Sequence, residues 1–150
     1  MTGQTKPTRK PRWQRSQFRR FVPMPTRWDD NDAFGHVNNV KYYAFFDTAI
    51  TFVEIEAGIF NSGSSPLVPY VVDSSCTYFE GVAFPDVLEV GVAIERIGRT
   101  SLTYRLGVFR PGADLPVAQG LFTHVYVDRA TERPAPMPDA VLKLAESLLS

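Results

Sequence analysis

The chain has 150 residues, 44% of them hydrophobic, and it carries equal numbers of basic and acidic side chains. This length suits one domain with a packed core and leaves little room for a second one. A formal net charge of zero gives no support for nucleic acid or a membrane surface as the main partner. We therefore expect neither a nucleic-acid-binding protein nor a membrane protein.

Residues 1–16 form a basic segment that contains no acidic side chain and no apolar run. This composition predicts a flexible arm in front of a folded domain at residues 17–150, although a basic segment could also attract a polyanion such as a cofactor phosphate. The lack of an apolar run argues against a secretory signal, so the cytoplasm is the expected compartment. The single cysteine, Cys76, fits that compartment and is expected to be a buried structural thiol rather than a nucleophile.

The first predicted elements are a strand and a long helix. Residues 18–28 suit a strand that contains two prolines and therefore belongs at an edge or in an irregular segment. Residues 41–60 predict a helix whose polar positions Asp47, Thr51 and Glu54 recur at helical spacing. The remaining surface of that helix is apolar, so we expect it to be largely buried. Gly58 is the expected stop signal.

The second half of the chain predicts strands and a short terminal helix. Four runs rich in β-branched and aromatic residues are separated by turn-like pieces, at residues 67–79, 87–98, 101–110 and 117–128. A short amphipathic helix is expected at residues 139–149. One long helix combined with several antiparallel strands predicts an α+β fold in which the sheet covers the helix.

The candidate chemistry lies between the first strand and the long helix. Asp30 and Asp32 stand two apart in a loop that Gly35 helps to turn, and Asn38 and Asn39 stand where the helix begins. The first backbone N–H groups of a helix lack intrahelical partners and carry partial positive charge. A carboxylate beside such a helix start provides half of a minimal acyl-transfer site.

Two structural alternatives apply to the same loop. Aspartates and asparagines before a helix are commonly caps and Asx turns without any catalytic role. A calcium loop is the other alternative, but Phe34 and Lys41 occupy positions where calcium ligands are required. The residues alone leave the choice between a cap and a catalytic carboxylate open.

This loop resembles the signature W-x-D-x-D-x-x-G-H-V-N-N-x-x-Y of the 4-hydroxybenzoyl-CoA thioesterase family of hotdog proteins. The resemblance extends from about residue 18 to the C-terminus, and it implies a single hotdog domain in which a curved antiparallel sheet wraps a long central helix. It departs from the pattern at Ile50, where many relatives carry an arginine. The matching residues are Trp28, Asp30, Asp32, Gly35, His36, Val37, Asn38, Asn39 and Tyr42.

The resemblance also implies roles for individual residues of an acyl-CoA thioesterase. Asp32 would be the catalytic carboxylate, acting as nucleophile or as general base, and the backbone N–H of Asn39 would polarise the thioester carbonyl. His36 and Asn38 would shape the pocket or position water, although His36 could equally be a loop residue that bonds to the backbone. Asp30 would be structural.

Substrate binding and assembly are also inferred from the resemblance. Tyr42, Arg99 and Arg96 would contact the substrate, the two arginines through the phosphates of CoA. A homodimer or homotetramer with active sites at the subunit boundary is implied. No cofactor is expected, because CoA is part of the substrate, and no metal site is expected from the two histidines, His36 and His124.

Two further functions remain as alternatives. Hotdog folds also host hydratases and dehydratases that act on acyl thioesters, and a non-catalytic acyl-CoA-binding protein could retain the same fold. Release of free thiol from an acyl-CoA would distinguish hydrolysis from both.

Overall fold

The computed structural model describes residues 10–59 and 63–149. Five strands form one antiparallel sheet in the order β1-β3-β4-β5-β2. The elements in chain order are η1 (Arg15–Gln17), β1 (Arg20–Pro25), η2 (Trp28–Asp30), α1 (Asn39–Glu56), β2 (Leu67–Tyr78), β3 (Val87–Ile97), β4 (Ser101–Phe109), β5 (Ala118–Asp128) and α2 (Asp139–Ser147). Each predicted helix and strand is present, with bounds that differ by a few residues.

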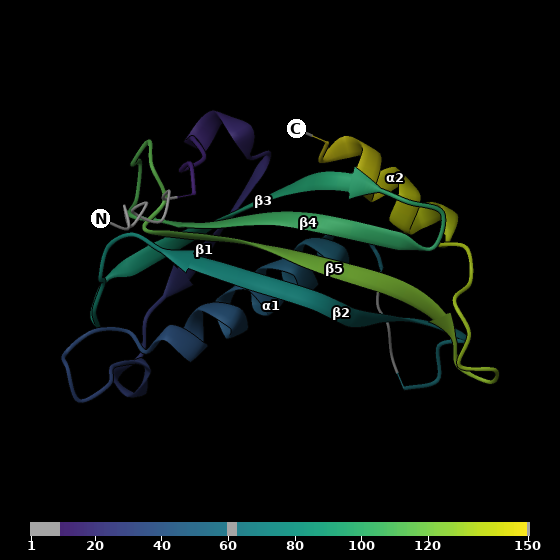
Figure 1. Cartoon of the computed structure of the whole chain (residues 1–150), viewed down its shortest axis with the longest axis horizontal. Helices are drawn as coiled ribbons and strands as arrows, with labels where there is room; N and C mark the ends of the chain where they lie inside the picture. Colours follow the sequence, from purple (N-terminus) through teal and green to yellow (C-terminus); the bar gives the residue numbers. More distant parts are fainter. Residues whose placement is uncertain (1–9, 60–62, 150) are drawn as a thin grey trace, which may run out of the picture.

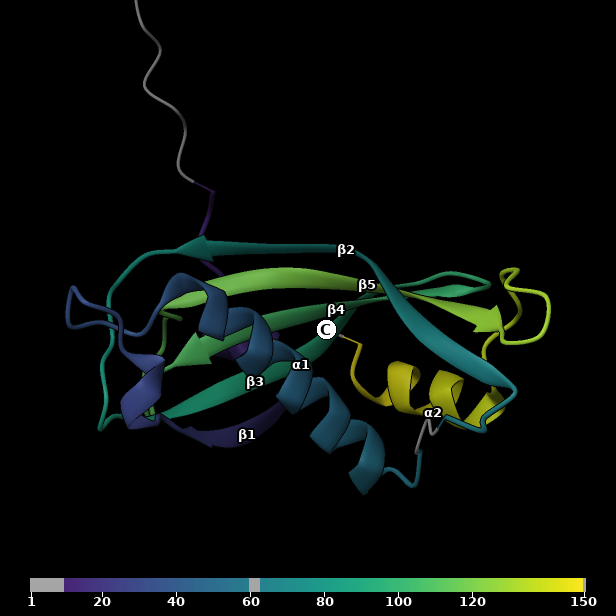
Figure 2. The ribbon, with the colours of Figure 1, turned by 90° about the horizontal axis from the view of Figure 1, so that it is seen from below.

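The sheet is curved, and α1 lies along one of its faces (Figures 1 and 2). Apolar side chains of α1 pack against inward-facing residues of β1, β3, β4 and β5, which forms the main core. The molecule is a single hotdog domain, which confirms the predicted α+β class. Among the described residues, no helix is both long and apolar enough to span a membrane.

The polar side of α1 differs from the sequence-based expectation. Asp47 and Thr51 are exposed as expected, but Glu54 is buried and accepts a hydrogen bond from the Tyr104 hydroxyl at 2.9 Å. Phe52 and Ile55, which belong to the apolar surface of a helix expected to be largely buried, are about half exposed. A buried carboxylate needs a donor, and Tyr104 on β4 supplies one that helical spacing alone cannot reveal. The helix ends near Gly58, which has a positive φ of 81° as expected of a stop signal.

The opposite face of the sheet carries a second, smaller apolar cluster. Ala93 lies between Val92 and Ile94 on β3, and because side chains alternate along a strand it points away from α1. Ala93 and Phe109 pack there with Phe18, and the rings of Trp13 and Phe21 cover the cluster. This cluster anchors the N-terminal segment to the sheet.

Part of the predicted arm is therefore bound to the domain. The Gln119 side chain, buried in β5, accepts a hydrogen bond from the Trp13 N–H at 2.8 Å and donates one to the Pro11 carbonyl at 2.9 Å. Arg15 forms an ion pair with Glu89 at 3.0 Å. Residues 1–9 of the arm lie outside the described residues. The proposed division between arm and domain at residue 16 stays a prediction.

Candidate functional site

The loop between β1 and α1 is held by polar contacts of its Asp30 and Asn31 side chains. The buried Asp30 carboxylate accepts a hydrogen bond from the Arg27 N–H at 2.7 Å and lies 3.8 Å from the Lys41 ammonium. The Asn31 side chain accepts one from the Phe84 N–H at 3.0 Å, which ties the loop to the segment before β3. These bonds give Asp30 the structural role expected of it.

Asp32 stands at the start of a tight turn. Its Oδ1 accepts a hydrogen bond from the Phe34 N–H at 2.9 Å, and its carbonyl accepts one from the Gly35 N–H at 3.1 Å. Gly35 has a φ of 81°, a left-handed conformation that glycine adopts without strain. The Asp32 N–H donates to the His36 carbonyl at 2.9 Å. This backbone hydrogen bond therefore holds Asp32 and His36 close together at the two ends of the turn.

The start of α1 is capped next to this turn. Asn38 is the N-cap, and its side-chain oxygen accepts a hydrogen bond from the Val40 N–H at 3.1 Å. The first helical residue is Asn39, whose carbonyl accepts a hydrogen bond from the Tyr78 hydroxyl at 2.9 Å. Tyr78, at the end of β2, thus fixes the first turn of the helix.

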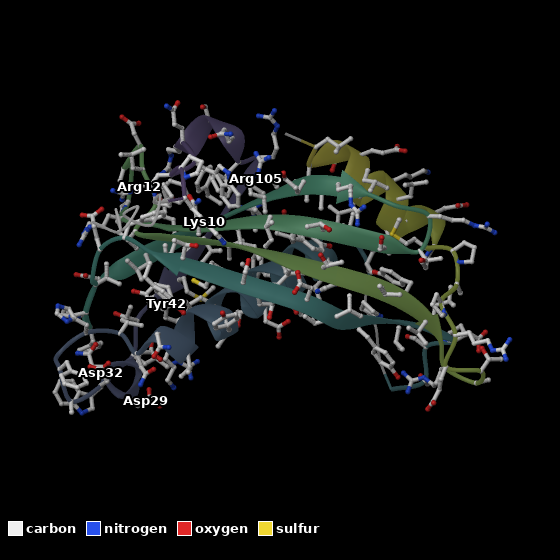
Figure 3. All side chains as sticks on the ribbon, in the orientation of Figure 1. Lys10, Arg12, Asp29, Asp32, Tyr42 and Arg105 are labelled. Carbon is white, nitrogen blue, oxygen red and sulfur yellow. The ribbon has the colours of Figure 1, made fainter. Side chains whose placement is uncertain are left out.

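A pocket of about 500 Å³ opens between this helix start and the segment after β2. Asp32, His36, Asn39 and Tyr42, four residues of the predicted site, lie together in its wall. Figure 3 shows Asp32 and Tyr42 at the same end of the molecule. The complete lining is Asp32, Phe34, His36, Val37, Asn39, Tyr42, Tyr78, Phe79, Glu80 and Gly81. Asn38 acts instead as the helix cap.

Residues 79–81, which follow β2, form another part of the pocket wall. The His36 ring packs against Gly81, where an added Cβ would lie 2.9 Å from His36 Cδ2. Glu80 forms ion pairs with Arg12 at 2.7 Å and with Arg110 at 3.4 Å. Hydrogen bonding from Arg12, the largest effect, lowers the pKa of Glu80. Arg110 also donates to the Gly81 carbonyl at 3.0 Å.

Three groups in and beside the pocket stay protonated at neutral pH. Burial raises the pKa of Tyr42 to about 12 and that of Cys76 to about 11, and it also raises the pKa of Tyr78. The positive charge of the Arg110 guanidinium opposes the rise in the pKa of Tyr42, but the effect of burial is larger. Cys76 is partly buried in β2 and is a protonated thiol rather than a thiolate. A role for it as nucleophile gains no support.

The two arginines predicted to bind CoA lie far from this pocket within one protomer. The loop with Asp32 follows β1, whose last residue pairs with Val87 at the start of β3. Arg96 and Arg99 lie at the other end of β3 and in the turn that follows it, and both are exposed. A strand of 11 residues spans about 35 Å. Within one chain these arginines therefore lie outside the pocket.

The sequence did not point to four residues that lie at or beside the pocket, namely Glu80, Gly81, Arg110 and Arg12. They come from the segment after β2, the end of β4 and the N-terminal segment, so no local motif connects them. Arg110 directly follows a predicted strand, but nothing in the sequence connects it with Glu80 and Gly81.

The remaining histidine lies in the sheet, as expected. His124 is buried in β5 against the Tyr104 ring, and burial lowers its pKa. Within residues 10–59 and 63–149, no three histidine, cysteine, aspartate or glutamate side chains are grouped to hold a metal ion.

Comparison with known proteins places the chain in a family. Residues 26–144 match the thioesterase-like superfamily. No curated protein matches the chain. The crystal structure of a Pseudomonas aeruginosa PAO1 protein, PA5185, is 44% identical, covers 93% of this chain and 98% of its own, and gives a TM-score of 0.89.

More distant structures share the fold. A 1,4-dihydroxy-2-naphthoyl-CoA thioesterase from Synechocystis is 14% identical, covers 85% of this chain and 96% of its own, and gives a TM-score of 0.80. The gentisyl-coenzyme A thioesterase BH1999 is 20% identical, covers 83% of this chain and 98% of its own, and gives a TM-score of 0.74. The match over residues 26–144 confirms the expected thioester hydrolase class at the level of the family, and this chain belongs to the thioesterase-like superfamily.

Proposed function

We propose that this chain hydrolyses acyl-CoA thioesters in the pocket that Asp32 and Asn39 share. The observation that carries the proposal is the position of a carboxylate and a helix start in one pocket wall. Membership of the thioesterase-like superfamily supports the reaction class. The solved relatives named for CoA thioesters support CoA as the carrier of the acyl group.

The proposed chemistry needs only groups of this chain and water. In one route the Asp32 carboxylate attacks the carbonyl carbon of the thioester, the CoA thiolate leaves, and water then hydrolyses the acyl anhydride of Asp32 to the free acid. In the other route Asp32 takes a proton from a water molecule that attacks the same carbon, and the CoA thiolate leaves and takes up that proton. Negative charge that develops on the carbonyl oxygen is stabilised by the backbone N–H of Asn39 at the positive end of α1. One such donor is worth about 3 kcal/mol in the transition state.

The phosphates of CoA require cations near the pocket mouth. Arg110 supports this role because it is exposed and contacts Glu80 and Gly81 of the pocket wall. Arg96 and Arg99 keep the role first expected of them only if a second protomer brings them to the pocket.

A homodimer would meet that condition. The edge strand β2 pairs only with β5 among the described strands, and it exposes Tyr70, Val71 and Val72. Unpaired strand edges with exposed apolar residues favour pairing with another chain. If two β2 strands pair antiparallel about a two-fold axis, the Arg99 end of one protomer lies beside the Asp32 end of the other.

Thiol release tests the proposed reaction. Short, long and aromatic acyl-CoAs are incubated with the native protein, Asp32→Asn and Asp29→Asn, and free CoA is followed with a disulfide reagent. Asp32→Asn retains an oxygen for the Phe34 N–H, so the turn persists while the carboxylate is lost. Asp29 is exposed in the same loop and provides the matched control. Figure 3 shows both aspartates at the same end of the molecule.

We expect thiol release to fall by at least about 100-fold in Asp32→Asn and to stay near the native rate in Asp29→Asn. An equal rate in Asp32→Asn and the native protein would exclude Asp32 as the catalytic carboxylate. Hydration of an enoyl-CoA without thiol release would support a hydratase, and acyl-CoA binding without turnover would support a binding protein.

A further inference from the structure

The N-terminal segment crosses the sheet face opposite α1 and reaches the candidate pocket. Residues 11–13 are held by the Gln119 side chain, and Trp13 packs on the second apolar cluster beneath the Arg105 guanidinium. The superfamily match begins only at residue 26, so this segment lies outside it.

Arg12 is the residue through which this segment touches the pocket wall. Its Nη2 donates to the Glu80 carboxylate at 2.7 Å and to the Pro116 carbonyl at 2.6 Å, and its guanidinium lies 4.7 Å from the centre of the Phe79 ring. Arg12 thus joins the segment after β2 to the β4–β5 loop. Phe79 and Glu80 both line the pocket.

The same wall positions His36. The ring of His36 packs on Gly81, the Val37 N–H donates to the Val82 carbonyl at 2.8 Å, and the His36 carbonyl accepts the Asp32 N–H. A displacement of residues 79–82 is therefore transmitted to the turn that carries Asp32.

We propose that Arg12 is a positioning residue of the active site, which holds Phe79 and Glu80 in place and thereby, through the adjoining Gly81, orients His36 and the Asp32 turn. Arg12 touches neither Asp32 nor the helix start, so it acts through the wall. The effect on turnover rests on the proposed thioesterase function, whereas the effect on His36 does not.

Arg15 provides a matched control on the same segment. The Arg15–Glu89 ion pair measures 3.0 Å and the Arg12–Glu80 pair 2.7 Å, and both arginines are about equally exposed, at 27% and 29%. Neither Arg15 nor Glu89 lines the pocket with Asp32. Substitution of Arg15 therefore measures how turnover responds when the N-terminal segment is held less firmly but its contact with the pocket wall at Glu80 remains.

The experiment compares Arg12→Gln, Arg12→Lys, Glu80→Gln and Arg15→Gln by steady-state kinetics with an acyl-CoA. We expect kcat to fall about tenfold in Arg12→Gln and Glu80→Gln with KM within about twofold, because small displacements of a catalytic group cost rate. In the double variant Arg12→Gln/Glu80→Gln, the loss of kcat should be smaller than the product of the two single losses, since both changes break the Arg12–Glu80 contact. Arg12→Lys should recover only part of the rate, because lysine lacks the planar fork.

Histidine NMR gives a readout that is independent of activity. The chain has two histidines, so the ring signals of His36 and His124 can be followed separately. We expect Arg12→Gln to shift the His36 signal and to leave that of His124, which is buried in β5, unchanged.

The outcomes separate the two proposals. An unchanged His36 signal in Arg12→Gln, or equal losses of kcat in Arg12→Gln and Arg15→Gln, would overturn the positioning role. A shifted His36 signal in a protein whose native form releases no thiol would leave the positioning contact in place and reject the thioesterase proposal alone.

Discussion

The ring of His36 lies so close to Gly81 that a Cβ at residue 81 would come within 2.9 Å of His36 Cδ2. The contact joins the loop before α1 to the segment after β2, which are 45 positions apart in the chain. Only glycine leaves the space that the ring occupies. The position of the His36 ring in the pocket wall therefore requires a residue without a side chain at position 81.

Gly81→Ala should impair turnover more than stability. The imidazole ring can swing away from a new methyl group, so we expect the free energy of unfolding to change by less than about 1 kcal/mol. If the position of His36 matters for the reaction, kcat should fall about tenfold. Urea unfolding and thiol release measure the two effects.

Gly63→Ala serves as the control for this substitution, because an added Cβ at Gly63 meets no atom within 4 Å. Native turnover in Gly81→Ala would show that the His36 contact has no part in the reaction.

Gly120→Ala should destabilise the whole sheet. Gly120 on β5 pairs with Cys76 on β2, and an added Cβ would lie 1.9 Å from the Ser75 carbonyl oxygen. A backbone atom cannot move away without breaking the β2–β5 pairing, so we expect a loss of about 3 kcal/mol or more. Urea unfolding followed by circular dichroism measures this loss. Native stability would contradict the close approach of the two strands.

Stability should fall as the pH rises from about 9 to about 12. Burial raises the pKa of Cys76 from 9.0 to about 11 and that of Tyr42 from 10.0 to about 12. In this range the folded state holds more protons than the unfolded state, so the free energy of unfolding decreases with pH. Urea unfolding at a series of pH values follows the decrease.

Cys76→Ser removes one of these groups, so its stability should depend less steeply on pH between about 9 and 11. The same slope in the variant and the native protein would show that the Cys76 thiol titrates alike in both states.

Val72→Lys should weaken the proposed homodimer. Val72 is 59% exposed on the edge strand β2, and a lysine on a strand edge opposes pairing with another chain. Sedimentation velocity over a range of concentrations should show dissociation at higher concentration than for the native protein. Leu115→Lys is the control, because Leu115 is 43% exposed in the β4–β5 loop and does not belong to the edge strand. Equal effects of both substitutions would argue against pairing through β2.

The sequence predicted the elements well because their signals are local. Alternating apolar residues, paired prolines in β1, the asparagine cap and Gly58 each act over a few positions. The prediction for the polar face of α1 was less accurate. Helical spacing assigned Glu54 to solvent, but a partner 50 positions away, Tyr104, makes its burial possible.

The sequence by itself determined the order of the elements, the turn that carries Asp32 and the cap that starts α1, since each depends on neighbouring residues. Only the tertiary structure decided the strand order, the contact of His36 with Gly81 and the bond of Arg12 to Glu80, 68 positions away. The physical reason is that such contacts arise when the folded sheet brings distant segments together. The conformational preferences of neighbouring residues do not indicate which distant segments will come into contact.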